Sequence, residues 1–366
     1  MEQETKADQL VVDTDVHTAY RTEEIREDVA SRLEEPYRSY LTKETLNYGP
    51  YPRDSFPKQG DNATGGTTED VVVESPETIQ RDLCEGFGVD VAVLNSLQKF
   101  DLIPQQERAI REMRAVNDVF VERFLDGNDQ FYGLAMLTTQ VPDKAAEEID
   151  RMADEDSIVG VMIHNGDSAK PLGNPMYDCI WAAAEDNDLP VCFHTSSVGY
   201  ANSRKFPFIY SDLQHYTAVH MLSHTFSHIT TATSLIVNQV VEKFPGLKFA
   251  FFEQDLSIVP LLMYRMNRET VQNPTEVPLL EKAPEEYFRD RFYWGTQPLP
   301  EPVNNQDLLG LIDLIGPENI LFSTDHPHND FDDPFSVINR YLSGLSDDDV
   351  DKIMYKNAND LFDLGL

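Results

Sequence analysis

The chain has 366 residues, of which 64 are Asp or Glu and 29 are Lys or Arg, so its formal net charge is −35. Nucleic acids and anionic lipid surfaces bind proteins through basic patches, and so acidic a chain excludes both as partners. The acidic residues are spread along the whole sequence, a pattern typical of proteins that work at high salt, where counter-ions screen self-repulsion. An ordinary acidic protein is the alternative.

The sequence carries no sign of secretion or membrane insertion. Residues 1–9 are polar and acidic, unlike a signal peptide, and no apolar run approaches the roughly 20 residues of a transmembrane helix. The three cysteines, Cys84, Cys179 and Cys192, do not make a disulfide framework. We therefore expect a cytoplasmic protein.

Eight short, apolar, β-rich runs recur along the chain. They are continuous rather than alternating, as expected of parallel strands that are buried on both faces. They span residues 10–15, 89–94, 131–137, 158–164, 190–194, 247–252, 292–295 and 320–325. Helical periodicity lies between most of them, which favours an α/β fold, the (β/α)8 TIM barrel, over an open sheet.

Helix boundaries and two insertions complete this organisation. Ser75-Pro76 and Asn174-Pro175 each place a capping residue before a proline and predict helix starts, and Gly316 ends a helix over 305–315. Another helix is expected over 230–244. The chain is expected to be one domain, 1–366, with its core at about 10–366 and insertions at about 18–74 and 195–229. Both insertions follow strands, so they should lie at the C-terminal face, where barrel active sites are built, unless they only decorate the fold or form subunit contacts.

Polar side chains stand at the ends of several predicted strands. His17 ends the first, His164 the fourth, His194 the fifth and Asp325 the eighth. Asp15 precedes His17 by two residues, and alternation along a strand turns both side chains the same way, so they can share one ion. Imidazole and carboxylate ligands from different strands predict a barrel metal site for Zn, Mn or Fe.

Several segments together resemble the amidohydrolase-2 family of the amidohydrolase superfamily, which includes enzymes like aminocarboxymuconate-semialdehyde decarboxylase. They are VVDTDVH, LPVCFHTS, VVEKFPGLKFAFFEQD, IGPENILFSTDHPHND and KIMYKNANDLFDL, and they run from about residue 10 to the C-terminus. The resemblance implies a TIM barrel with one divalent metal ion. The implied metal ligands are Asp15, His17, His194 and Asp325.

Two departures from the family pattern bear on the chemistry. Asp15 stands where the family usually has a histidine, which moves the preference from zinc, the first choice, toward Mn or Mg; Fe also stays open. Glu253 ends the sixth strand where decarboxylase-type members carry a catalytic histidine. Glu253 is either a general acid/base or a carboxylate held by an arginine at the edge of the core.

The catalytic candidates are therefore Asp325, Glu253 and His164; His164 is either a pocket residue or a hydrogen-bonded histidine at the edge of the core. No lysine ends the fourth strand, which argues against the dinuclear members of the superfamily. Arg204, His224 and His326 are the candidates for substrate binding, and Lys205 and Arg291 are further cations that could hold a substrate carboxylate. Each of these cations is otherwise a surface salt-bridge residue.

Four histidines follow the fifth strand: His215, His220, His224 and His228. The last three recur every four residues and share one face of a helix. The preferred interpretation is a helix that packs beside the barrel mouth, with its histidines paired to acids or to a partner subunit. In this interpretation one of them, His224, reaches the substrate.

The expected function is hydrolysis of a small, carboxylated amide, ester or lactone by metal-activated water. Non-oxidative decarboxylation of an aromatic or unsaturated acid is the alternative, which the loss of the sixth-strand histidine at Glu253 weakens slightly. A non-catalytic binding barrel is the second alternative. A small-molecule substrate and a homodimer or higher homo-oligomer are expected as partners.

The charge predicts that stability depends on salt. At molar salt the screening length falls to about 3 Å, so repulsion among the acidic side chains weakens and the free energy of unfolding rises. We expect the midpoint of thermal unfolding, followed by circular dichroism, to rise by several degrees from dilute buffer to molar KCl. Equal midpoints would show that the acidic composition is incidental to stability.

Overall fold

The computed structural model describes residues 9–18, 22–43, 73, 75–195, 216–328 and 331–366. Eight strands form one parallel sheet in chain order. They are β1 (Val12–His17), β2 (Val91–Asn95), β3 (Phe131–Met136), β4 (Ile158–His164), β5 (Val191–His194), β6 (Phe249–Phe252), β7 (Phe292–Gly295) and β8 (Ile320–Leu321). The runs of β-rich sequence therefore mark the strands, although β8 is shorter than its run.

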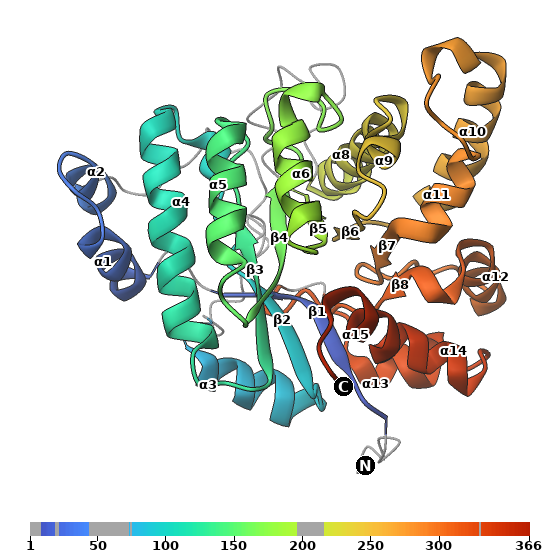
Figure 1. Ribbon diagram of the computed structural model, residues 1–366. Coiled ribbons are helices and arrows are strands. Elements are labelled where there is room, and N and C mark those ends of the chain that lie inside the picture. The colour runs from blue at the N-terminus through green and yellow to red at the C-terminus, as the bar shows by residue number, and fades with distance from the viewer. Residues whose placement is uncertain (1–8, 19–21, 44–72, 74, 196–215, 329–330) are drawn as a thin grey trace.

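The sheet closes on itself between its first and last strands. Val16 forms a parallel bridge with His326, and the backbone N–H of Thr14 donates to the carbonyl oxygen of Phe322 over 3.0 Å. Asp325 N donates in turn to Asp15 O over 3.1 Å. These bonds join β1 to the chain that follows β8, and the predicted TIM barrel is confirmed (Figure 1).

Helices surround the strands (Figure 1). The α-helices are α1 (Glu23–Ser31), α2 (Tyr37–Lys43), α3 (Pro76–Ile79), α4 (Gln106–Phe120), α5 (Pro142–Met152), α6 (Asp178–Asp186), α8 (Tyr216–Val237), α9 (Val240–Lys243), α10 (Ile258–Gln272), α11 (Pro284–Arg291), α12 (Asn305–Ile315), α13 (Pro334–Ser336), α14 (Asp347–Asp351) and α15 (Asn357–Phe362). Short 3-10 or π segments are η2 (Gln80–Glu85), η3 (Phe100–Leu102), η4 (Val121–Leu125), η5 (Pro175–Tyr177), η7 (Pro274–Glu276), η8 (Pro317–Asn319), η9 (Val337–Tyr341) and η10 (Lys352–Lys356). In the described part of the chain, no helix is long and apolar enough to cross a membrane.

Local sequence accounts for most helix boundaries. Pro76 starts α3 directly after Ser75, and the side chain of Asn174 accepts a hydrogen bond from the N–H of Met176 at the start of η5. Gly316 ends α12 with φ of 100°, a conformation that glycine adopts without strain.

The helix expected over 230–244 differs from its prediction at both ends. It begins earlier, as α8 at Tyr216, within the range expected for the second insertion. It is also interrupted, because Gln239 has φ of 59° and separates α8 from α9. The buried residues in the earlier part of α8, such as His224, Ser227 and His228, are polar, so the periodicity of apolar residues could not locate its start.

The core positions the site through strand alternation. The rings of Phe193, Phe251 and Trp294 on β5, β6 and β7 are buried and pack in a row with neighbouring centroids 4.9 Å apart. Phe193 also meets Trp181 of α6 edge to face, which places this aromatic layer between the strands and the helices. Because neighbouring side chains along a strand face opposite ways, His194 points into the barrel interior.

Candidate metal centre

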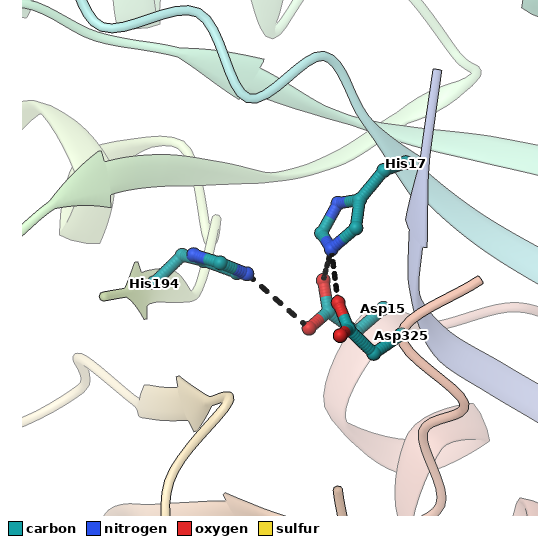
Figure 2. Close-up of side chains that lie close together, drawn as sticks. All are labelled: Asp15, His17, His194 and Asp325. Carbon is teal, nitrogen blue, oxygen red and sulfur yellow. Dashed lines mark hydrogen bonds and ion pairs between the residues drawn. The ribbon is translucent and has the colours of Figure 1, made fainter. Parts of the chain in front are cut away.

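Four side chains converge at the C-terminal mouth of the barrel (Figure 2). They are Asp15 and His17 of β1, His194 at the end of β5 and Asp325 after β8. Each offers a ligand atom that lies within 4.8 Å of the other three, and all four residues are buried. Sequence neighbourhood cannot bring three distant segments together, so this convergence is what the predicted metal centre requires.

The surroundings of both histidines leave Nε2 as an acceptor. Asn95 Nδ2 donates to Asp15 Oδ1 over 2.8 Å, so Asn95 Oδ1, at 3.0 Å, accepts a hydrogen bond from His17 Nδ1. His194 Nδ1 donates to the carbonyl oxygen of Thr195 over 2.7 Å. Both rings therefore carry their proton on Nδ1 and turn a lone pair toward the carboxylates, as metal-ligating histidines do.

As a result, hydrogen-bond acceptors of the histidines lie close to acceptors of the carboxylates. His17 Nε2 lies 2.6 Å from Asp325 Oδ1, and His194 Nε2 lies 3.6 Å from Asp15 Oδ2. Asp15 Oδ2, Asp325 Oδ2 and His194 Nε2 are buried and have no hydrogen-bond partner within the described residues. A divalent cation among these atoms would satisfy them all, so the side chains fit one ion with two nitrogen and two carboxylate donors.

Burial sets the charge of these groups. It lowers the pKa of His17 to about 3 and that of His194 to about 4, so both imidazoles are neutral. Burial, and after it the charge of Asp325, raises the pKa of Asp15 well above its ordinary value, and burial also raises the pKa of Asp325. Adjacent buried carboxylates resist ionisation unless a positive charge offsets them, which is the role that a cation fills here.

Asp13 ties the two strands of the barrel seam together. Its carboxylate is buried and accepts hydrogen bonds from the N–H and the hydroxyl of Thr324 and from the N–H of Asp15. Burial raises the pKa of Asp13 to about 7. Asp13 thus holds the backbone of Thr324, the residue before Asp325, and the backbone of Asp15 itself.

Glu253 lies beside the cluster and is held by a histidine. Its Oε2 is 3.4 Å from His194 Nε2, and its Oε1 accepts a hydrogen bond from His224 Nε2 of α8 over 2.9 Å. Glu253 is 7% exposed, so its carboxylate faces the barrel mouth rather than bulk water. One of the two interpretations of Glu253 expected an arginine to hold its carboxylate; the structure places the imidazole of His224 there.

The two acidic residues that end β6 and follow β8 share a backbone feature. Glu253 has φ of 54° and Asp325 has φ of 63°, in the left-handed region that side chains other than Asn and Asp seldom adopt. Such conformations persist only where the surrounding structure enforces them, and they cluster at functional sites. They are consistent with both carboxylates being aimed into the mouth.

His164 lies beside the cluster without belonging to it. Its ring meets that of His194 edge to face with centroids 5.6 Å apart, and its Nδ1 lies 3.2 Å from Thr195 O. Burial, and after it the charge of Lys99, lowers its pKa well below the ordinary value. His326 is turned elsewhere, with its ring 6.0 Å from that of Phe331, so the structure does not bring it to the four ligands.

The remaining candidates divide between structural roles and segments outside the description. His228 is buried, receives a hydrogen bond from Asn165 Nδ2 over 2.9 Å and packs edge to face on Phe251, so its partner is an amide rather than the expected acid. Arg204, Lys205 and His215 lie outside the described residues, as does the side chain of His220.

Arg291 corrects a prediction. It precedes β7, at the opposite end of the barrel from the metal cluster, and it donates to the carbonyl oxygens of Val241, Phe244 and Pro245 over 2.7, 3.1 and 2.9 Å. It therefore holds the end of α9 rather than a substrate. Its position before the strand, rather than after it, already indicates that Arg291 lies at the N-terminal end of the barrel, away from the site.

Three site residues escaped the sequence analysis. Asn95 ends β2 and orients both ligands of β1; a polar residue at the end of an apolar strand was the available signal. His328 Nδ1 lies 2.7 Å from Asp325 Oδ1. Lys99 follows β2 near enough for its charge to act on His17 and His164, but the sequence offers no sign of this proximity.

A family model described as Amidohydrolase, the amidohydrolase-2 model, matches residues 87–364. The chain belongs to this family. The gamma-resorcylate decarboxylase of Rhodococcus jostii RHA1 is 28% identical to it over 306 residues, which are 79% of this chain and 88% of that protein.

Solved structures of decarboxylases share the fold. The 2,6-dihydroxybenzoate decarboxylase from Rhizobium has a TM-score of 0.68 at 22% identity and covers 98% of this chain and 100% of its own. The dihydroxybenzoic acid decarboxylase from Polaromonas sp. JS666, solved with manganese and the inhibitor 2-nitroresorcinol, has a TM-score of 0.66 at 22% identity and covers 98% of both chains.

These comparisons correct the expected reaction. Hydrolysis of an amide, ester or lactone, the first expectation from the sequence, is wrong, because the similar proteins are decarboxylases. The resemblance pointed to a family that contains both chemistries, and Glu253 in place of the sixth-strand histidine favoured the wrong one. The chain is an enzyme of this family rather than a non-catalytic barrel.

Asn95 allows a test of how the site is held. Asn95→Leu removes the hydrogen bonds to His17 and Asp15 while keeping all four ligands, and losses of this kind typically weaken metal binding about tenfold to hundredfold. We expect that loss in titrations of the metal-free protein with Mn²⁺. Asn319→Leu is the matched control, because Asn319 is buried at the other end of the barrel, bonded to Arg289 O and Phe292 O. Equal affinity in the wild type and Asn95→Leu would contradict the assignment.

Proposed function

We propose that the protein is a divalent-metal-dependent decarboxylase that releases CO2 from an aromatic carboxylic acid. The observation that carries the proposal is the buried set of two neutral imidazoles and two carboxylates whose free atoms face one another. Similarity to a gamma-resorcylate decarboxylase over most of both chains supports the choice of reaction.

Manganese is the ion we propose, ahead of zinc, the first choice from the sequence. Carboxylate donors favour harder ions than zinc, and the Polaromonas decarboxylase structure contains manganese. When bound, such an ion polarises substrate oxygens and offsets the negative charge of the site. Asp15, His17, His194 and Asp325 would hold it.

The charge of the site also determines how an acid can bind. The carboxylates of Asp15, Glu253 and Asp325 would repel the carboxylate of a substrate, so a positive charge has to face it. Besides the ion, the ammonium group of Lys99 is suited to this task, because its field reaches His17 and His164 at the mouth. Arg204 remains a prediction for the same task.

The reaction needs one proton at carbon. The bond between the ring and the carboxylate breaks, its electron pair stays with the ring, and the proton takes the place of the departing CO2. We assign the proton transfer to Glu253, whose Oε2 faces the metal cluster while His224 donates to its Oε1. Asp325 would act with it by binding the ion, and His224 would position Glu253 at the edge of the substrate site.

Several expectations remain predictions alongside this proposal. They are the homo-oligomeric state, the cytoplasmic location, the adaptation to high salt and the substrate contact of His326.

The reaction class is tested by supplying the manganese-loaded protein with a panel of hydroxybenzoates, amides and lactones. We expect CO2 release from at least one aromatic acid, measured as gas or as the loss of the acid by chromatography, and no opening of the lactones. Protein stripped with a chelator should be inactive and should recover with Mn²⁺. Hydrolysis of an amide or lactone without CO2 release would overturn the proposed function.

Glu253→Gln separates proton transfer from metal binding. The amide keeps the size of the side chain but cannot deliver a proton, so turnover should fall by about 10²–10⁴-fold, the usual range for general acids and bases. Manganese content should be unchanged, since Glu253 is not one of the four ligands. Glu148→Gln is the matched control, because Glu148 is a buried carboxylate on α5, away from the mouth. Unchanged turnover in Glu253→Gln would assign the proton to another group.

A further inference from the structure

His164 is placed to contact whatever binds beside the metal centre. It pairs with His194 in the register of β4 and β5, so both side chains point into the barrel interior. It is 4% exposed, and its ring meets that of His194 with centroids 5.6 Å apart. Its ligand atoms nevertheless lie outside the group of four that could hold the ion.

One backbone oxygen fixes the protonation of both rings. The carbonyl oxygen of Thr195 lies 2.7 Å from His194 Nδ1 and 3.2 Å from His164 Nδ1, and a carbonyl can only accept. Each neutral ring therefore has its proton on Nδ1 and a bare lone pair on Nε2. In His194 that lone pair faces the carboxylate of Asp15, whereas His164 Nε2 is buried and has no partner in the described part of the chain.

A bare acceptor discriminates between substrate groups. It attracts an O–H or N–H donor and repels carbonyl, carboxylate and ether oxygens. On an aromatic acid bound through its carboxylate, the donor that would reach this position is a ring hydroxyl. Lys99 adds a positive charge near His164, which favours the oxygen of that same hydroxyl.

We propose that His164 Nε2 accepts a hydrogen bond from a ring hydroxyl of the substrate, and that the enzyme therefore selects hydroxylated aromatic acids over their unsubstituted or methoxylated counterparts. The inference rests on the proposed function, because it assumes an aromatic acid at the metal centre. It gives the fourth strand a role in substrate selection that is separate from metal binding and from proton transfer.

The test uses ligand pairs that differ by one hydroxyl group. For the manganese-loaded full chain, we would measure kcat/KM for 2,6-dihydroxybenzoate and 2-hydroxybenzoate. Dissociation constants for the inhibitor 2-nitroresorcinol and for 2-nitrophenol would be measured by calorimetry. The wild type should prefer the compound with the extra hydroxyl, and His164→Phe should lower that preference by about tenfold to hundredfold, the range for an unmade buried hydrogen bond. His164→Gln, whose side-chain carbonyl can also accept, should retain part of the preference.

The outcomes distinguish this proposal from the proposed function. An unchanged preference in His164→Phe, no preference in the wild type, or failure of the wild type to bind either inhibitor would overturn the role of His164. Loss of manganese from both His164 variants would also overturn it, since His164 would then be a ligand. The decarboxylase assignment fails separately, if the wild type releases no CO2 from any aromatic acid while its binding preference is intact.

Discussion

The site is organised around one electrostatic problem, which is how to keep buried carboxylates close together. Asp15 and Asp325 are fully buried, and Glu253 reaches the same space. Burial without compensation drives such groups toward their neutral forms, as the raised pKa values of Asp15 and Asp325 indicate. A single divalent cation held by these side chains would reverse that tendency for both carboxylates at once, which would couple metal binding to the charge state of the site.

Among the described residues, the barrel seam itself holds this arrangement. β8 is only two residues long, and the chain that continues it is secured to β1 by backbone bonds and by the carboxylate of Asp13. Asn95, at the end of β2, hydrogen bonds to both ligands on β1, so a third strand helps to hold the site. The positions of Asp15, His17 and Asp325 are thus set by the closure of the barrel itself. Groups fixed on strands are held more precisely than groups on loops, which suits a metal centre.

The sequence predicted the parts of the molecule that follow from local pattern. Apolar runs located the strands because parallel strands are buried on both faces, and polar residues at the ends of those runs identified Asp15, His17, His194 and Asp325. Contacts between residues on different strands could not be predicted in the same way. Nothing in the order of residues indicates that Asn95 orients His17 or that one carbonyl serves two histidines. The start of α8 was missed for a similar reason, since the buried residues described before Ala232 in this helix include His224 and His228 and are polar.

The buried histidines of α8 also bear on Glu253, the departure from the family pattern that favoured hydrolysis over decarboxylation. Glu253 occupies the position at which decarboxylase-like members are expected to carry a histidine, and this substitution seemed to argue against decarboxylation. The structure brings an imidazole to the same place by another route, because His224 of α8 hydrogen bonds to Glu253 at 2.9 Å. When a carboxylate and an imidazole are in contact, one can carry a proton while the other orients it. This division does not depend on which of the two is attached to the strand and which to the helix. The chemistry of a barrel site therefore depends on which groups meet at its mouth, and a strand-by-strand comparison of residue types can miss a pair whose second member comes from a helix.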